Sequence, residues 1–476
     1  MPEEEDAMFV GRKEELARLE KMYAGEKMEM AVVYGRRRVG KTTLISEFCK
    51  NKRTVFFSCL QMSAAQNLEA LSAAVARAED GASEAVRTFV SFADAFTRMA
   101  ELAARQRLVV VLDEYPYLAK AEPGISSLLQ NFLDHQFKET KLFLILCGSS
   151  MSFMEKQVLG YQSPLYGRRT AQFKVEPFDY YETAAWFAGR SREEQAILYG
   201  ITGGVPLYLE QFSPALSLRE NLLENFFSRS AMLFEEPGNL LKQELREPER
   251  YNSIITAVAA GSTKLSEIAA AVRLETGVCS KYIDSLIELG ILCRETPVTE
   301  PRSKRPVYQI SDPFFRFWYT FVPRNMALIQ SGRMEKVYDE VVGSRLHDYM
   351  GQVFERICRD WVLFHAEDLP FIPAAAGRWW GGDPKTKKQA EIDLVAPSAD
   401  GTQVIVGSCK FRAAPLGPGD LALMAQYADA MGGGFSRRYY WFFSLGGFTD
   451  AFHQRAAADP ESVRLLTLED LYPRGN

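Results

Sequence analysis

The chain has 476 residues, of which 25% are charged and 47% are hydrophobic, and its formal net charge is −5. A chain of this length is too long for one hydrophobic core, so we expect about three or four domains. The negative balance excludes a surface that is basic throughout and confines any contact with nucleic acid to a local patch.

Neither the cysteines nor the first residues indicate an exported or membrane protein. The seven cysteines are scattered without a Cys-x-x-Cys pair, and only four histidines occur, which supports neither a disulfide framework nor zinc ligation. The chain begins with an acidic segment, and its longest apolar runs fall far short of a membrane span. We therefore expect a cytoplasmic protein without a membrane partner.

The first chemical signal follows an apolar strand predicted at residues 30–34. There the chain reads Gly35-Arg36-Arg37-Arg38-Val39-Gly40-Lys41-Thr42-Thr43 and continues into a helical pattern. Two glycines that frame four residues let successive N–H groups point into one concavity, and the helix N-terminus adds partial positive charge. Such a loop binds a polyphosphate, with Lys41 on the β/γ-phosphates and Thr42 on a bridging Mg²⁺. Thr43 is a weaker candidate for the same role.

A second apolar strand, predicted at residues 108–112, ends in two carboxylates, Asp113 and Glu114. A strand at 54–57 and a helical stretch at about 64–105 separate it from the loop. In an open parallel sheet, ligands bind at the carboxyl ends of the strands. Asp113 can complete the Mg²⁺ shell while Glu114 polarises the attacking water, as hydrolysis of a nucleoside triphosphate requires.

The next predicted strand, residues 142–147, stops at Gly148-Ser149-Ser150. A hydroxyl of Ser149 or Ser150 can bind the γ-phosphate, although turn chemistry places serines there equally well. Further along, Arg168 and Arg169 lie in a turn before a strand predicted at 172–175. One of them can act as an arginine finger, in cis or on a neighbouring subunit, or else form an ordinary ion pair.

The middle of the chain is predicted to be mainly helical. Residues 179–246 are interrupted by Gly203-Gly204-Val205-Pro206, which predicts a rigid kink between helices. From residue 251, three short helices precede two strands at 290–293 and 306–310, a pattern typical of a winged helix-turn-helix. The segment Arg302-Ser303-Lys304-Arg305 between the strands suits backbone phosphates. The third helix carries few cations, so a mechanical spacer is favoured over base reading.

The last third predicts a separate α/β unit. Glu391 and Asp393 alternate with apolar residues, so both carboxylates face one side of a strand. Lys410 ends the following strand, and Glu355 lies in a preceding helix. These residue types can hold a Mg²⁺-activated water near a phosphodiester. They are equally typical of an ordinary ion pair on a polar strand face.

The combination of motifs resembles the archaeal-type ATPase family, a branch of the AAA+/STAND-related P-loop ATPases. The motifs are Phe9-Val10-Gly11-Arg12, Gly35 to Thr43, Val111-Leu112-Asp113-Glu114, Gly148-Ser149-Ser150, Leu165-Tyr166-Gly167-Arg168-Arg169 and Gly203-Gly204-Val205-Pro206. The last third resembles the DUF234 domain, which is similar to PD-(D/E)XK nucleases. The resemblance implies an α/β fold: a P-loop ATPase core with a parallel sheet, a helical lid, a winged helix-turn-helix and a restriction-endonuclease-like domain, at residues 1–178, 179–246, 247–320 and 321–476 respectively.

The resemblance also implies ATP and Mg²⁺ as cofactors and assigns residue roles. Val10, Gly11 and Pro206 would border the adenine. Asp113 and Glu114 would serve the metal and the water, Ser149 or Ser150 would be the sensor, and Arg168 or Arg169 the finger. One position departs from the nuclease pattern, because many relatives carry an acid where this chain has Ser408. A neutral hydroxyl supplies no charge to a divalent metal.

We therefore expect an ATP-hydrolysing switch protein whose nucleotide state moves the lid and the winged helix relative to the nuclease-like domain. DNA, a protein and a second copy of the chain are the candidate partners besides ATP. One alternative is an ATP-controlled, Mg²⁺-dependent DNA nuclease that acts through Asp393 and Lys410. The other is a non-catalytic module that binds nucleotide and recognises a partner. Ser408 disfavours the nuclease, while Lys41 and Glu114 favour hydrolysis.

Overall fold

The computed structural model describes residues 9–79, 88–303, 306–383 and 386–473. The chain forms two compact units. The N-terminal unit comprises residues 1–178 and 205–207, and the C-terminal unit comprises residues 179–204 and 208–476. The basic segment predicted at Arg302 to Arg305 falls partly outside the described residues, since 304 and 305 are not among them.

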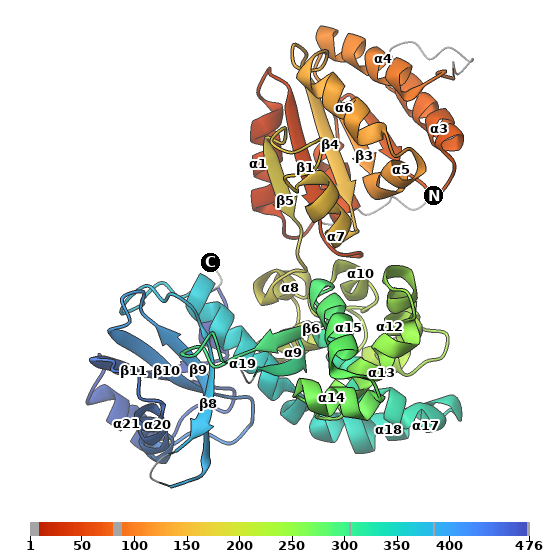
Figure 1. The fold of residues 1–476 in the computed structure, drawn as a ribbon. Helices are drawn as coiled ribbons and strands as arrows, with labels where there is room; N and C mark the ends of the chain where they lie inside the picture. The colour runs from red at the N-terminus through yellow and green to blue at the C-terminus, as the bar shows by residue number, and fades with distance from the viewer. Residues whose placement is uncertain (1–8, 80–87, 304–305, 384–385, 474–476) are drawn as a thin grey trace. The chain divides into compact units, whose positions relative to one another are not determined.

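The N-terminal unit is built on a five-stranded parallel sheet in the order β2-β3-β4-β1-β5 (Figure 1). The strands are β1 (Glu29–Tyr34), β2 (Thr54–Ser58), β3 (Leu108–Asp113), β4 (Leu142–Gly148) and β5 (Ala171–Lys174). Every residue of β1, β3 and β4 is buried, as expected for central parallel strands covered on both faces. The predicted α/β fold with a parallel sheet is confirmed.

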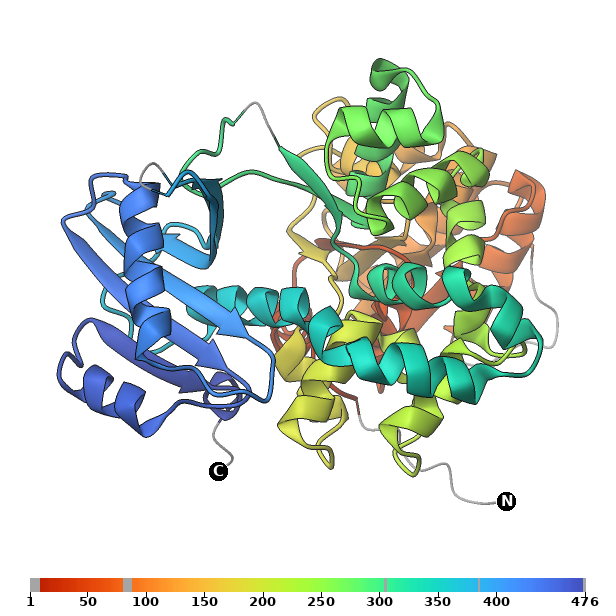
Figure 2. The same cartoon turned by 90° about the horizontal axis from the view of Figure 1, so that it is seen from below.

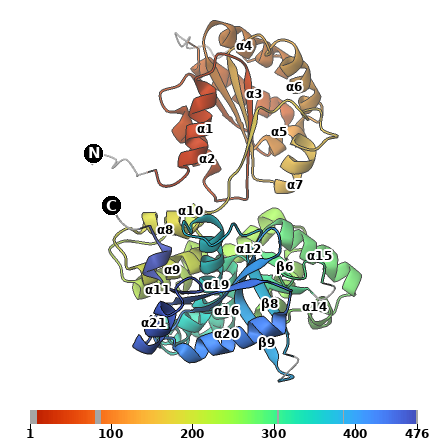
Figure 3. The same cartoon turned by 90° about the vertical axis from the view of Figure 1, so that its left-hand side faces the viewer.

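Helices cover both faces of this sheet (Figure 3). Alternate residues of β1 pack to opposite sides: Ala31 and Val33 join α1 and α2 in one core, whereas Met30 and Val32 join α3 to α6 in the other. The helices are α1 (Lys13–Tyr23), α2 (Lys41–Cys49), α3 (Ala64–Arg77), α4 (Phe92–Arg105), α5 (Tyr115–Ala121), α6 (Ile125–Asp134) and the single turn α7 (Met151–Phe153). The sheet is thereby fixed between two layers, and the loops after β1, β3 and β4 meet at one edge.

The C-terminal unit begins with helices. They are α8 (Tyr180–Trp186), α9 (Arg192–Thr202), α11 (Leu218–Phe226) and α12 (Met232–Glu244), together with the second half of α10 (Pro206–Leu209), whose first two residues belong to the N-terminal unit. Gly203 and Gly204 end α9 with φ of 63° and 68°, a left-handed conformation that favours glycine. The predicted kink therefore corresponds to a helix C-terminus followed at once by Pro206 in the first position of α10.

Three further helices and an antiparallel hairpin follow in this unit (Figure 2). They are α13 (Pro248–Ala259), α14 (Leu265–Val272), α15 (Thr276–Glu288), β6 (Leu292–Glu295) and β7 (Val307–Ile310). Helix α16 (Pro313–Phe321) runs across the boundary predicted at 320/321, so a domain border at that point falls inside a helix. The short helices α17 (Met326–Gln330) and α18 (Met334–Val337) lead to the long α19 (Leu346–Phe364).

The C-terminal unit also contains a second five-stranded sheet, in the order β12-β11-β10-β9-β8. Its strands are β8 (Gly377–Gly382), β9 (Gln389–Pro397), β10 (Gln403–Lys410), β11 (Arg437–Ser444) and β12 (Val463–Thr467), with helices α20 (Pro418–Met431) and α21 (Asp450–Ala457). Strands β8, β9 and β10 are antiparallel, while β10, β11 and β12 are parallel. Within the described ranges, no helix has both the length and the apolar character needed to cross a bilayer.

Candidate functional site

The loop between β1 and α2 has the backbone of a phosphate-binding loop. Gly40, with φ of 83°, lies in the left-handed region and precedes the first helical residue, Lys41. Lys41 is buried, and its Nζ donates to the carbonyl oxygen of Arg36 at 2.9 Å. That bond folds the ammonium group back over the loop. No ion pair within 4 Å includes Lys41 in the described part of the chain, and burial is the main cause of its lowered pKa.

The two predicted carboxylates lie at the same edge of the sheet as this loop. The hydroxyl of Thr42 donates to Asp113 Oδ2 at 3.0 Å, and Asp113 Oδ1 accepts from the backbone N–H of Glu114 at 3.1 Å. Thr42 and Asp113 thus present two neighbouring oxygen atoms, the donor type that Mg²⁺ prefers. The structure brings together the two side chains that the sequence assigned to the Mg²⁺ shell, and that assignment stays a prediction.

Glu114 turns away from Asp113 towards the adjacent strand. Its φ of 52° is unusual for a residue with a Cβ and redirects the chain into α5. Glu114 Oε2 accepts bonds from the Ser149 hydroxyl at 2.9 Å and from the Ser149 N–H at 3.2 Å. Of the two candidate serines, Ser149 is therefore the one bonded to Glu114, whereas Ser150 precedes α7 without a capping hydrogen bond.

The segment before α1 is tied to the loop by Arg12. Its Nη2 donates to the carbonyl oxygen of Val39 at 3.2 Å and also to that of Glu176, and its guanidinium lies 4.8 Å from the centroid of the Phe178 ring. Val10 and Gly11 are therefore held beside the loop by the residue that follows them. Sequence reasoning quoted Arg12 only as part of a motif, and its burial and its reach to Val39 and Glu176 are visible only in the structure.

Pro206, the first residue of α10, also lies close to the loop. Its Cγ lies 3.7 Å from the point that a Cβ on residue 40 would occupy. Arg37 also has a partner that the sequence did not suggest, since its Nη2 donates to the Tyr117 hydroxyl at 2.8 Å. Arg36, Arg38 and Thr43 lie in or next to the loop, with Arg38 at φ of 73°.

Of the two candidate finger arginines, Arg168 is bonded to a residue outside the loop. Arg168 forms a two-pronged ion pair with Asp134, with nitrogen–oxygen distances of 2.8 and 2.6 Å. Thr170, two residues later, donates its N–H to the Met30 carbonyl at 2.8 Å. The backbone of Arg168 and Arg169 therefore lies beside the amino-terminal end of β1. The phosphate loop follows the carboxyl end of that strand. This register favours the ion-pair alternative for Arg168 over an in-cis finger.

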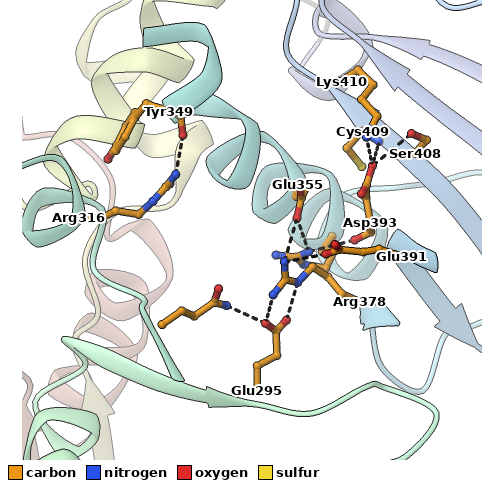
Figure 4. Close-up of polar contacts among 12 residues, drawn as sticks. Glu295, Arg316, Tyr349, Glu355, Arg378, Glu391, Asp393, Ser408, Cys409 and Lys410 are labelled. Carbon is orange, nitrogen blue, oxygen red and sulfur yellow. Dashed lines mark hydrogen bonds and ion pairs between the residues drawn. The ribbon is translucent and has the colours of Figure 1, made fainter. Parts of the chain in front are cut away.

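The C-terminal unit carries a separate group of charged side chains, which we call the acidic cluster: Glu295 on β6, Glu355 on α19, and Glu391 and Asp393 on β9 (Figure 4). Arg378, on β8, lies among three of them. It bonds to Glu295 at 3.2 and 2.6 Å, pairs with Glu391 at 3.1 Å and lies 4.0 Å from Glu355. The burial of Arg378 opposes its charge, but the ion pairs outweigh this, so its pKa is raised.

The carboxylate of Asp393, on β9, is hydrogen-bonded by three consecutive residues of the adjacent strand β10. Its Oδ2 accepts from the Ser408 hydroxyl at 3.2 Å, the Cys409 N–H at 2.9 Å and Lys410 Nζ at 2.8 Å. Glu391 and Asp393 both line one cleft of about 820 Å³, as the alternation on the strand predicted. Within the described residues, no group of three His, Cys, Asp or Glu side chains is arranged to hold a metal ion.

Glu355 is the carboxylate most affected by its surroundings. Burial, followed by the charge of Asp393, raises its pKa to about 7, against an ordinary value of 4.5. Arg359 lies 3.6 Å from it and also donates to the Asp393 carbonyl at 3.0 Å. The cluster is thus held by Arg359, Arg378 and Lys410, and a divalent metal does not fit a set of carboxylates already paired in this way. Sequence reasoning found three of the four acids and Lys410, but it missed the acid Glu295 and the roles of Arg359 and Arg378.

The fold and the first site define a P-loop ATPase-type domain, and comparison with known proteins agrees. A family model described as an ATPase domain predominantly from Archaea matches residues 9–212, and the DUF234 model of archaeal and bacterial proteins of unknown function matches residues 318–417. An uncharacterized protein of Methanocaldococcus jannaschii is 30% identical over 409 residues, which cover 85% of this chain and 88% of that protein. The chain belongs to this family of archaeal-type ATPases with a DUF234 region, as the motifs indicated.

Other similar proteins match smaller parts or match more weakly. An uncharacterized ATP-binding protein of the same archaeon is 54% identical over 46 residues, covering 10% of this chain and 78% of that protein. Among solved structures, the Walker-type ATPase of Pyrococcus abyssi is 19% identical with a TM-score of 0.49, covering 65% of this chain and 96% of that one. An ORC2 protein of Aeropyrum pernix is 14% identical with a TM-score of 0.45, covering 72% and 97%. The ATP-binding role therefore rests on the family and on the loop itself.

Proposed function

We propose that this protein hydrolyses ATP and uses the nucleotide state as a switch. The observation that carries the proposal is the hydrogen-bonded series at one sheet edge: Thr42 to Asp113 at 3.0 Å and Ser149 to Glu114 at 2.9 Å, beside Lys41. Thr42 and Asp113 would hold Mg²⁺, which neutralises charge on the phosphates when it is bound. Lys41 binds the β/γ-phosphates as a point charge, because no carboxylate of the described residues competes for it within 4 Å.

In this proposal, Glu114 orients and polarises the attacking water, and Ser149 holds Glu114 in place. With ATP bound, the γ-phosphate competes for the Ser149 hydroxyl, which frees a carboxylate oxygen for the water. Arg12 extends the effect of the loop, since one guanidinium contacts both Val39 in the loop and Glu176, close to the end of the N-terminal unit at residue 178. A shift of the loop would therefore displace residues 176–178 through their contacts with Arg12.

The test of hydrolysis compares Glu114→Gln with Glu139→Gln, a matched change at an exposed position of the same unit. We expect Glu114→Gln to bind ATP with unchanged affinity by calorimetry and to release phosphate on the order of a hundredfold more slowly, the usual contribution of a positioned base. Glu139→Gln should behave like the natural protein. Turnover by Glu114→Gln at the parental rate would remove Glu114 from the mechanism.

A second function is favoured by the cleft of about 820 Å³ in the C-terminal unit. It is lined by the cations Arg316, Arg378 and Lys410 and by the rings of Trp380 and Tyr427. Glu391 and Asp393 also line it, and Arg378 and Lys410 offset their charges. Cations with stacking surfaces suit a nucleic-acid strand. We propose that this cleft binds DNA without cutting it, because Ser408 replaces an acid and Arg378 already neutralises its neighbours.

Cleavage and binding are measured separately with a labelled DNA duplex and single strand. The natural protein should bind with an affinity that falls as salt rises and should leave the DNA intact in Mg²⁺. Ser408→Glu adds the missing carboxylate beside Asp393 and tests whether a metal can then be held. Mg²⁺-dependent cleavage by the natural protein that Asp393→Ala abolishes would replace this proposal with the nuclease alternative.

A further inference from the structure

A smaller cavity of about 340 Å³ lies in the C-terminal unit between the hairpin, α16 and α19. We call it the arginine cavity, because five arginines and two glutamates are among its lining residues: Arg294, Arg316, Arg356, Arg359, Arg378, Glu295 and Glu355. It shares Gln309, Ile310, Arg316, Gln352 and Arg378 with the larger cleft, so the two hollows adjoin. The excess of guanidinium groups over carboxylates indicates an anionic occupant.

Four of these arginines do not need an external partner. Arg378 is paired with Glu295 and Glu391, and Arg359 lies 3.6 Å from Glu355. Arg356 donates to the Ser311 carbonyl at 3.0 Å and lies 3.7 Å from Asp360, while Arg294 is exposed to solvent. The question of what the cavity binds therefore centres on Arg316.

In the described part of the chain, the contacts of the Arg316 guanidinium are with uncharged groups of Tyr349. Its Nη2 donates to the Tyr349 carbonyl at 2.8 Å, and its charge lies 4.4 Å from the centroid of the Tyr349 ring (Figure 4). Among the described residues, it has no ion pair within 4 Å. Burial lowers its pKa, as expected for a cation that has lost water without gaining a carboxylate. A guanidinium has five N–H donors, so a carbonyl and an aromatic face leave most of them for a ligand.

We propose that Arg316 is the anchor of a phosphoryl-binding subsite in the arginine cavity. A phosphate monoester matches the planar fork of an arginine with two parallel hydrogen bonds, and the amide of Gln352 stands at the same wall. The cavity opens onto the cleft that carries Lys410 and Asp393, so the phosphate can belong to the end of a nucleic-acid strand or to a small phosphorylated molecule. If the phosphate is the end of a nucleic-acid strand, this inference rests on the proposed DNA cleft. If the phosphate belongs to a small molecule, it does not.

The test uses the full chain with excess ADP present to occupy the phosphate loop. Two labelled single-stranded oligonucleotides of one sequence, with a 5′-phosphate or a 5′-hydroxyl, are compared by fluorescence anisotropy, and inorganic phosphate is titrated by calorimetry. We expect the natural protein to bind the 5′-phosphorylated strand about tenfold more tightly, the effect of one charge-assisted contact. Arg316→Gln should abolish that preference, and Arg316→Lys should keep part of it.

The matched control is Arg324→Gln, which removes the same charge from an exposed position and should leave the preference intact. If Arg316→Gln fails to fold, Gln352→Ala tests the same wall from an exposed residue of α19 and should weaken the preference about threefold. Arg316-dependent binding of inorganic phosphate without any oligonucleotide binding would support the subsite, assign it to a small ligand and count against the DNA cleft. Equal affinity for both strands, with no Arg316-dependent phosphate binding, would overturn the proposal.

Discussion

The phosphate loop and the acidic cluster use the same residue types in opposite ways. At the loop, the buried ammonium of Lys41 donates to a backbone carbonyl, and its charge is left without an ion pair in the described chain. In the cluster, the single guanidinium of Arg378 contacts three carboxylates, those of Glu295, Glu391 and Glu355, and Lys410 bonds to Asp393. The first site therefore still offers its charge to a ligand, whereas the second has neutralised its charges internally.

This comparison teaches that carboxylates near a lysine do not by themselves define a metal site. What matters is whether the cations of the fold have already taken them. The Arg378 side chain also links β8 to the hairpin, since its Nη2 donates to Glu295 on β6 at 2.6 Å. The same residue thus serves packing and charge balance, and its loss should affect stability more than the loss of Lys41.

The largest expected effect is that of Arg378→Gln, which leaves Glu295 and Glu391 without their partner. Breaking a buried ion pair costs about 3 kcal/mol of unfolding free energy, with only 13% of the Arg378 side chain exposed. All six tryptophans lie in residues 179–476, so their fluorescence in urea reports on the C-terminal unit. The control is Arg437→Gln, which breaks an exposed pair with Glu461 and should cost well below about 1 kcal/mol. Equal effects of both changes would contradict internal neutralisation.

The second prediction concerns Lys41→Ala. Removing the loop's cation should weaken ATP binding at least tenfold by calorimetry, because a charged contact to phosphate is lost. The stability of the protein without nucleotide should fall by about 1 kcal/mol at most, because Lys41→Ala removes the hydrogen bond to the Arg36 carbonyl but no ion pair among the described residues. Lys50→Ala, at the other end of α2, serves as the control for affinity. Unchanged ATP affinity would contradict the assignment of the loop as the phosphate-binding site for ATP.

A third prediction uses the raised pKa of Glu355. The folded protein holds a proton on Glu355 up to about pH 7, whereas the unfolded chain releases it near 4.5. Ionisation of Glu355 therefore costs stability, with no effect below pH 4.5 and a growing cost between 4.5 and 7. Glu355→Gln should match the natural protein at low pH and exceed it by about 1–3 kcal/mol at pH 8. A constant difference across this window in urea unfolding would refute the raised pKa.

The smallest expected effect is that of Arg168→Ala. Its pair with Asp134 is partly exposed, so the stability should change by about 0.5 kcal/mol. If Arg168 has only this structural role, ATP turnover per molecule should stay constant as protein concentration rises. A finger supplied by a neighbouring copy would instead make turnover rise more than linearly, and an Arg168→Ala Arg169→Ala protein would regain activity when mixed with Glu114→Gln.

The candidate N-terminal site could be predicted from the sequence, because its parts are local. The loop from Gly35 to Thr43 needs only two glycines and a helix start, and Asp113 with Glu114 needs only a strand end. Parallel pairing then brings them to one edge, as the pattern of apolar strands predicted. The family followed from the same residues.

The tertiary structure alone decided the partners of the arginines. Nothing local links Arg378 to Glu295, 83 residues earlier, or Arg168 to Asp134, 34 residues earlier. Long charged side chains reach across elements, and their choice of partner depends on packing and burial rather than on spacing. For the same reason, the sequence showed Arg316 as one cation in an aromatic helix. Only the fold left it beside a cavity with a carbonyl and a ring, but no carboxylate of the described chain, within ion-pair distance.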